Sequence, residues 1–118
     1  MRAELETFFQ RAYQAFNARD IDTAVALMCP DVEWANGMEG GHVHGRGEVR
    51  DYWTRQWKII DPHVSPQRID VADDGRVSVE VRQVVRDLSG AVLSEKNVRH
   101  IYRMKDGLVA RMDIEERP

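Results

Sequence analysis

Hydrophobic residues recur at helical spacing in the first half of the chain and at alternate positions in the second half. The first helical stripe predicts a helix with one buried face; it consists of Leu5, Phe8, Phe9, Ala12, Tyr13 and Phe16. A second, shorter helix is expected after Asp20, whose side chain caps it; its buried side consists of Ile21, Ala24, Val25 and Met28. Pro30 is expected to stop this helix, because proline lacks the amide N–H and its ring clashes with the preceding turn.

A short strand and a third helix are expected next. The strand places Val32, Trp34 and Asn36 on one face. Five glycines between positions 37 and 47 predict a loop after it. The third helix ends before Pro62, and its buried stripe consists of Val49, Tyr52, Trp53, Gln56 and Ile60.

From about Ser65 the pattern alternates with a period of two, which is typical of strands. Three turn signals divide this half into four strands; they are Asp73-Asp74-Gly75, Ser89-Gly90 and Lys105-Asp106-Gly107. The order of elements predicts an α+β fold in which three N-terminal helices pack in a curved, mixed or antiparallel sheet. The result is a cone-shaped fold with an internal cavity, formed as one domain over residues 1–118.

The two later turns predict how the last three strands pair. A two-residue loop at the second turn places Val79 opposite His100. A three-residue loop at the third turn places His100 opposite Met112. Both pairings put His100 on the apolar face, whereas a slip of one residue at the third turn would set it opposite Asp113 and expose Met112.

Composition excludes several classes of function. The 17 basic residues are outnumbered by 20 acidic ones and are scattered, so no surface suited to nucleic acid is expected. The longest apolar run, from Ala24 to Pro30, is too short to span a membrane. The single cysteine, Cys29 at the end of the second helix, is expected to be a buried thiol in a reducing compartment. Residues 1–12 lack the apolar run of a signal peptide, so a cytoplasmic location is expected.

Three segments carry a resemblance to a known family. They read F-N-A-R-D-I-D-T-A-V-A-L-M followed by D-V-E-W, then H-G-R-G-E-V-R-D-Y-W, then Y-R-M-K-D-G-L-V-A-R-M-D-I. With them the chain resembles the nuclear transport factor two-like superfamily, in particular its SnoaL-like and ketosteroid isomerase-like proteins. The resemblance covers nearly the whole chain and implies a cone with a ligand-sized cavity and frequently a homodimer. It does not specify an activity, because the superfamily hosts isomerases, dehydratases, cyclases, epoxide hydrolases and plain binding or assembly domains.

The resemblance also implies roles for individual residues. Tyr13 matches the ketosteroid isomerase tyrosine that donates a hydrogen bond to the substrate oxygen. Asn36 stands where that family has its aspartate base, and His100 stands where it has a protonated aspartate. An amide cannot shuttle a proton, so steroid isomerisation by the family mechanism is not expected. The W-A-N of the first strand is similar to a limonene epoxide hydrolase pattern, but the third strand reads V-R-Q at 81–83 and lacks the Arg-x-Asp of that enzyme.

These considerations define a candidate site. The candidate catalytic residues are His100, Tyr13 and Asn36, and the candidate substrate-binding residues are Trp34, Trp53, Trp57, Val79, Tyr102 and Met112. Each also has a purely structural interpretation: Tyr13 and His100 as hydrogen-bonded core residues, Asn36 as a turn residue, the tryptophans as core. His42 and His44 lie two apart in the glycine-rich loop, with only Glu39 nearby as a third ligand, so no metal site is expected.

Two classes of function remain open. The first is a cofactor-independent isomerase, dehydratase or cyclase that acts on a small hydrophobic, oxygen-bearing molecule, with a neutral His100 as base and then acid. It requires His100 and either Tyr13 or Asn36 to face one cavity. The second is a non-catalytic ligand-binding or assembly domain. A homodimer is expected across the outer sheet face, which presents Ser78, Glu80, Arg82, Val84, Arg99, Ile101 and Arg103.

Overall fold

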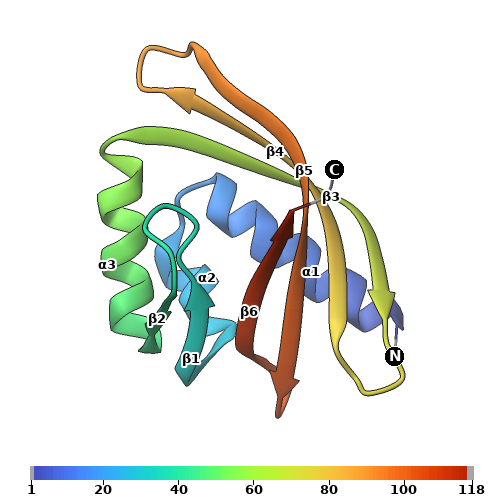
Figure 1. Cartoon of the computed structure of the whole chain (residues 1–118). Helices are drawn as coiled ribbons and strands as arrows, with labels where there is room; N and C mark the ends of the chain where they lie inside the picture. Colours follow the sequence, from blue (N-terminus) through green and yellow to red (C-terminus); the bar gives the residue numbers. More distant parts are fainter. Residues whose placement is uncertain (1, 117–118) are drawn as a thin grey trace.

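Three helices pack against one curved sheet of six strands in the computed structural model, which describes residues 2–116 (Figure 1). The elements in chain order are α1 (Arg2–Asn17), α2 (Ile21–Ala26), β1 (Met28–Ala35), β2 (His42–His44), α3 (Gly45–Trp57), β3 (Ile60–Val71), β4 (Val77–Asp87), β5 (Val92–Lys105) and β6 (Leu108–Glu116). The strand order is β2-β1-β6-β5-β4-β3. Only the β1–β6 pair is parallel, so the sheet is mixed and the predicted α+β fold is confirmed.

The second helix is shorter than predicted. Asp20 caps it as expected, since its Oδ1 accepts a hydrogen bond from the Thr23 N–H at 3.3 Å. The helix ends at Ala26, however, and Met28 to Pro30 already belong to β1. Pairing with β6 explains the difference, because the Val109 N–H donates to the Leu27 carbonyl at 3.0 Å and draws the chain into the sheet. Cys29 is therefore a buried strand residue and does not end a helix.

Two more element boundaries differ from the predictions. The third helix ends at Trp57, and Ile60 and Pro62 belong to β3 instead of following or ending the helix. A proline is tolerated there because β3 is an edge strand, and on its open side no neighbouring strand requires a hydrogen bond from the missing N–H. The glycine-rich segment also contains a strand, since β2 pairs with β1 and places His42 opposite Ala35.

The pairing of β4 with β5 is the predicted one, with Val79 opposite His100. The pairing of β5 with β6 was predicted wrongly: His100 lies opposite Ile114, and Met112 lies opposite Tyr102. The turn is a two-residue turn at Asp106 and Gly107, both with positive φ (53° and 79°), and a bulge follows it. The register thus moves by two residues, and an even shift leaves His100 on the same face of the sheet.

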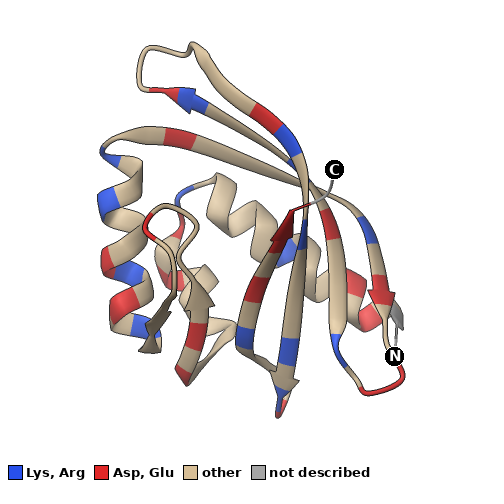
Figure 2. Cartoon of the chain, in the orientation of Figure 1, with Lys and Arg blue, Asp and Glu red and all other residues tan. Residues whose placement is uncertain are grey.

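The core lies between the helices and the inner face of the sheet. Val79, Val81 and Val98 are each at most 1% exposed, and Phe9 of α1 is fully buried against them. Acidic and basic residues are interspersed along α3 and the strands (Figure 2). Within residues 2–116, no helix has the length and apolar character needed to cross a membrane.

Candidate functional site

A pocket of about 250 Å³ lies between the helices and the inner face of the sheet. Its wall is mostly apolar and aromatic, and its lining includes Phe9, Tyr13, Phe16, Trp34, Tyr52, Trp53, Gln56, Gln83, His100, Tyr102, Val109, Met112 and Ile114. Pockets with this character bind small molecules through apolar contacts and a few oriented polar groups. The polar groups of this wall are therefore the ones that could orient a bound molecule.

Three of these polar groups form a buried row of hydrogen bonds. The Tyr13 hydroxyl, from α1, lies 2.8 Å from Nδ1 of His100 and 2.8 Å from the hydroxyl of Tyr102. His100 and Tyr102 both come from β5, two residues apart, so the alternation of a strand places them on the same face. Tyr13 and His100 are 5% and 7% exposed. We call these three residues the buried row.

Burial keeps the buried row uncharged. It lowers the pKa of His100 from 6.5 to about 4, because desolvation disfavours the imidazolium. Burial also raises the pKa of the Tyr13 hydroxyl well above its ordinary value, with a smaller contribution from Tyr102, and it raises that of Tyr102. All three side chains are therefore neutral at pH 7, and His100 carries one ring proton.

Trp34 and Trp53 form part of the pocket wall and meet edge to face, with ring centroids 5.5 Å apart. Trp34 also lies near Tyr102, at 6.2 Å between centroids. Met112 is 2% exposed and completes this side of the lining. The structure thus brings six of the predicted site residues to one pocket; they are Tyr13, Trp34, Trp53, His100, Tyr102 and Met112.

Asn36 does not line this pocket. Its Oδ1 accepts hydrogen bonds from the backbone N–H groups of Met38 (3.1 Å) and Glu39 (2.8 Å), and its Nδ2 donates to the Glu39 carboxylate at 2.8 Å. That last bond is the main reason why the pKa of Glu39 is lowered. The amide holds the turn after β1 together, which is the structural interpretation of this residue. It faces an adjoining pocket that shares four lining residues with the first; they are Ala35, Gly37, Gln83 and Ile114.

Trp57 and Val79 also lie outside the lining of the first pocket. Trp57 packs against Phe16 at 5.4 Å between ring centroids, and the Arg19 guanidinium lies 4.9 Å from its ring. Val79 is fully buried in the core, directly opposite His100 on the neighbouring strand. Neither residue forms part of the surface of the first pocket.

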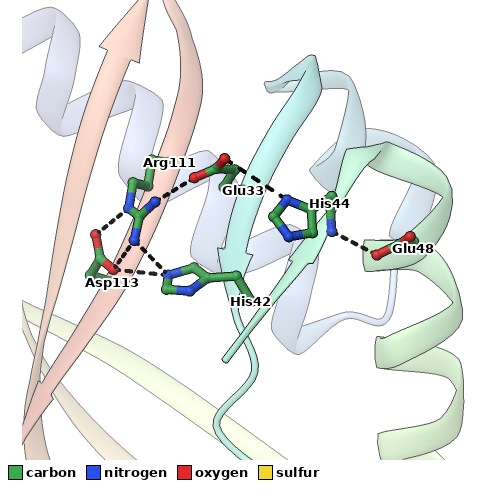
Figure 3. Close-up of polar contacts among 6 residues, drawn as sticks. All are labelled: Glu33, His42, His44, Glu48, Arg111 and Asp113. Carbon is green, nitrogen blue, oxygen red and sulfur yellow. Dashed lines mark hydrogen bonds and ion pairs between the residues drawn. The ribbon is translucent and has the colours of Figure 1, made fainter. Parts of the chain in front are cut away.

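The two histidines of the glycine-rich segment belong to a charged cluster (Figure 3). Nε2 of His42 lies 2.9 Å from Asp113, which the Arg111 guanidinium also contacts at 2.9 Å, and Arg111 pairs with Glu33 as well. Within residues 2–116, no group of three His, Cys, Asp or Glu side chains is arranged to hold a metal ion. Arg111 and Asp113 flank Met112 along β6, so strand alternation directs them away from the first pocket.

Three polar residues of the pocket were not among the predicted site residues; they are Gln83 of β4 and, on α3, Tyr52 and Gln56. The Tyr52 hydroxyl accepts a hydrogen bond from the Gly37 N–H at 3.1 Å, and Nε2 of Gln56 donates to the same hydroxyl at 3.3 Å. Burial raises the pKa of Tyr52, and the bond from Gly37 opposes that shift. The sequence contained a signal for Tyr52 and Gln56, since both occupy the buried stripe of the third helix although their side chains end in polar groups.

Comparisons with known proteins agree with this geometry. Residues 9–112 match the SnoaL-like domain family, and the chain belongs to that family. Its fold is the nuclear transport factor two-like, ketosteroid isomerase-like fold expected from the sequence. No curated protein sequence matches the chain.

Several solved structures are similar to the chain over most of its length. TerC, co-crystallised with polyporic acid, is 25% identical with a TM-score of 0.81, over 94% of this chain and 89% of TerC. An NTF2-like protein of unknown function from Burkholderia pseudomallei is 23% identical with a TM-score of 0.82, over 95% and 89% of the two chains. Rv0760c from Mycobacterium tuberculosis, in complex with estradiol-17β-hemisuccinate, is 17% identical with a TM-score of 0.75, over 90% and 88%.

Proposed function

We propose that this SnoaL-like domain binds a small hydrophobic, oxygen-bearing molecule in the pocket and moves a proton on it through His100 and Tyr13. The observation that carries the proposal is the buried row on the wall of a mostly apolar pocket. Isomerisation, dehydration and cyclisation fit this arrangement, because each requires proton transfer near an oxygen function. The ligands named for TerC and Rv0760c, an acid and a steroid ester, also carry oxygen and support this ligand class.

The buried row offers a relay that creates no charged side chain. In one direction Nδ1–H of His100 donates to Tyr13 and Tyr13 donates to Tyr102, which leaves a lone pair on Nε2 of His100. Nε2 then takes a proton from a ligand carbon while Tyr102 gives its hydroxyl proton to the ligand oxygen. The Nδ1 proton passes to Tyr13 and the Tyr13 proton passes to Tyr102, so the row ends neutral and reversed.

This relay suits a site where the imidazolium is disfavoured. A buried His100 with a pKa of about 4 is a poor acceptor if it must remain charged. It accepts a proton more readily when Nδ1 releases one to Tyr13 in the same step. The ligand changes from a ketone to its enol, and the reverse transfer at another carbon completes an isomerisation without a cofactor.

Deuterium exchange tests this proposal before the natural substrate is identified. A library of hydrophobic ketones is screened for binding by thermal shift, and the ligands that bind are incubated with the protein in D₂O. We expect deuterium to be incorporated at the carbon beside the carbonyl, and NMR measures this incorporation. In His100→Ala the incorporation should be lost. The matched control is His42→Ala, which removes the histidine of the charged cluster and should leave the exchange unchanged.

Ligand binding without chemistry is the second candidate function. It is favoured by the low pKa of His100, which makes this histidine a weak base. It is also favoured by the position of Asn36, which lies outside the pocket wall and so does not hold a ligand oxygen there. Binding of ketones with no deuterium exchange in wild-type protein would support it. Failure of every hydrophobic ligand to bind would contradict both candidates.

We also propose that the chain forms a homodimer across the outer sheet face. Val84 and Ile101 are apolar and only partly buried there, between charged neighbours such as Arg99, which pairs with Glu115 at 3.3 Å. Apolar residues of this kind on a polar face are suited to a self-complementary contact. Sedimentation at high micromolar concentration should give twice the 13.6 kDa chain mass, and a single-chain mass would contradict the proposal.

A further inference from the structure

Gln56 leaves one end of its amide without a partner at the edge of the pocket. Its Nε2 donates to the Tyr52 hydroxyl at 3.3 Å, whereas its Oε1 is buried and has no hydrogen-bond partner within residues 2–116. Gln56 lies one helical turn after Tyr52, on the same face of α3, and both residues line the pocket. The Tyr52 hydroxyl is itself held by the Gly37 N–H.

One end of the Gln56 amide is unpaired in either orientation of the amide. If the amide is reversed, Oε1 accepts from Tyr52, and Nε2 with its two N–H groups is left unpaired instead. Almost all buried polar groups in proteins are hydrogen-bonded, so an unpaired polar atom on a side chain that lines a pocket calls for an explanation. A ligand hydroxyl satisfies either orientation, because it both donates and accepts.

We propose that Gln56, positioned by Tyr52, forms a second polar subsite that binds a hydroxyl of the ligand. The proposal rests on the proposed function in one respect, namely that the pocket binds a hydrophobic molecule. The buried row comes from α1 and β5, whereas the subsite comes from α3, and no hydrogen bond among the described residues links the two. The ligand class is therefore a hydrophobic molecule with two separated oxygen functions, one for the buried row and one for Gln56.

The test compares probes that differ by one hydroxyl. The dissociation constants of 2-naphthol, 2,6-dihydroxynaphthalene and 2,7-dihydroxynaphthalene are measured by quenching of the pocket tryptophans and by calorimetry. In wild-type protein, at least one diol should bind about tenfold more tightly than 2-naphthol, as pairing a buried polar group predicts. In Gln56→Met, which has a similar volume and no amide, that preference should disappear while the affinity for 2-naphthol is kept.

Gln83→Met is the matched control, since Gln83 is a second partly buried glutamine in the lining. It should keep the preference for the diol. Equal binding of all three probes to wild-type protein, or loss of the preference only in Gln83→Met, would overturn the subsite and leave the proposed function intact. Failure of 2-naphthol and both diols to bind wild-type protein would contradict the proposed function and the subsite together.

Discussion

His100 and His42 show what two environments do to the same side chain. His100 is 7% exposed, and burial lowers its pKa to about 4. Within residues 2–116, the only hydrogen-bond partner of its ring is the Tyr13 hydroxyl. His42 lies at the sheet edge, 2.9 Å from the Asp113 carboxylate, in a cluster that also contains Arg111 and Glu33 (Figure 3). One histidine is kept neutral by the exclusion of water, and the other lies among charges that water partly solvates.

The two environments predict different sensitivities to mutation. Exposed ion pairs contribute little to stability, because solvent and salt screen them and long side chains lose freedom. A buried row of neutral hydrogen bonds is more sensitive, because each group that loses its partner stays desolvated. We therefore expect changes to the buried row to have large effects and changes to the charged cluster to have small ones.

The largest effect is expected for proton transfer. His100→Ala removes the relay and should lower the rate of deuterium exchange by roughly two to four powers of ten, the usual range for loss of a general base. Circular dichroism should show that the variant keeps its fold. An exchange rate that falls equally in His42→Ala would contradict the assignment of the chemistry to the buried row.

The pH dependence of stability should also come mainly from His100. Its folded pKa of about 4 lies below the unfolded value of 6.5, so the unfolded chain takes up the proton first as the pH falls. The stabilisation is complete above about pH 6.5 and is lost between that pH and about 4, by roughly 3 kcal/mol. Urea unfolding from pH 7 to pH 4 should show this loss in wild-type protein and a smaller one in His100→Gln. Parallel curves for the two proteins would show that His100 titrates normally.

Next in size is the effect of breaking the buried row at its centre. Tyr13→Phe leaves both His100 and Tyr102 without their shared partner and should lower the free energy of unfolding by about 1–3 kcal/mol. Tyr102→Phe removes only the terminal bond, so it should cost less. Chemical denaturation of the two variants measures the difference, and a larger loss in Tyr102→Phe would contradict the central position of Tyr13.

The sequence predicted the face of the sheet on which His100 and Tyr102 lie, but it did not predict which β6 residues lie opposite them. Period-two alternation put His100 and Tyr102 on the apolar face. The shorter turn at Asp106-Gly107 and the bulge after it each moved the β6 partner by one residue, and the total shift of two did not change that face. The exact pairing of His100 with Ile114 depended on a bulge that has no reliable sequence signal.

The polar residues were harder to assign. Asn36 and Gln56 are both amides next to apolar residues, and only the three-dimensional arrangement shows that Asn36 is saturated by its own turn while Gln56 is not. The His42–Asp113 contact joins residues far apart in the sequence. It depends on the short strand β2, which was not predicted because the glycines around it indicated a loop. Partners of this kind follow from the packing of distant elements, which local patterns do not encode.

The smallest effect is expected in the charged cluster. Arg111 holds the pKa of Asp113 below its ordinary value of 3.8, so Asp113 stabilises the fold at neutral pH and loses that contribution as the pH falls below that value. Because both side chains are more than a third exposed, Arg111→Met and Asp113→Asn should each change stability by less than about 1 kcal/mol. Urea unfolding at low and high salt measures this, and the effect should shrink with salt. A loss as large as that of Tyr13→Phe would contradict the comparison.

The most direct test of the central claim is an NMR titration of the ring nitrogens in ¹⁵N-histidine-labelled protein. His100 should stay neutral from pH 8 down to about pH 4, with its two ring nitrogens distinct because Nδ1 is hydrogen-bonded to Tyr13. The His100→Gln spectrum assigns the signal. A His100 pKa near 6.5 or above 7 would show a solvated or charged ring, and it would contradict the neutral buried row on which the proposed function depends.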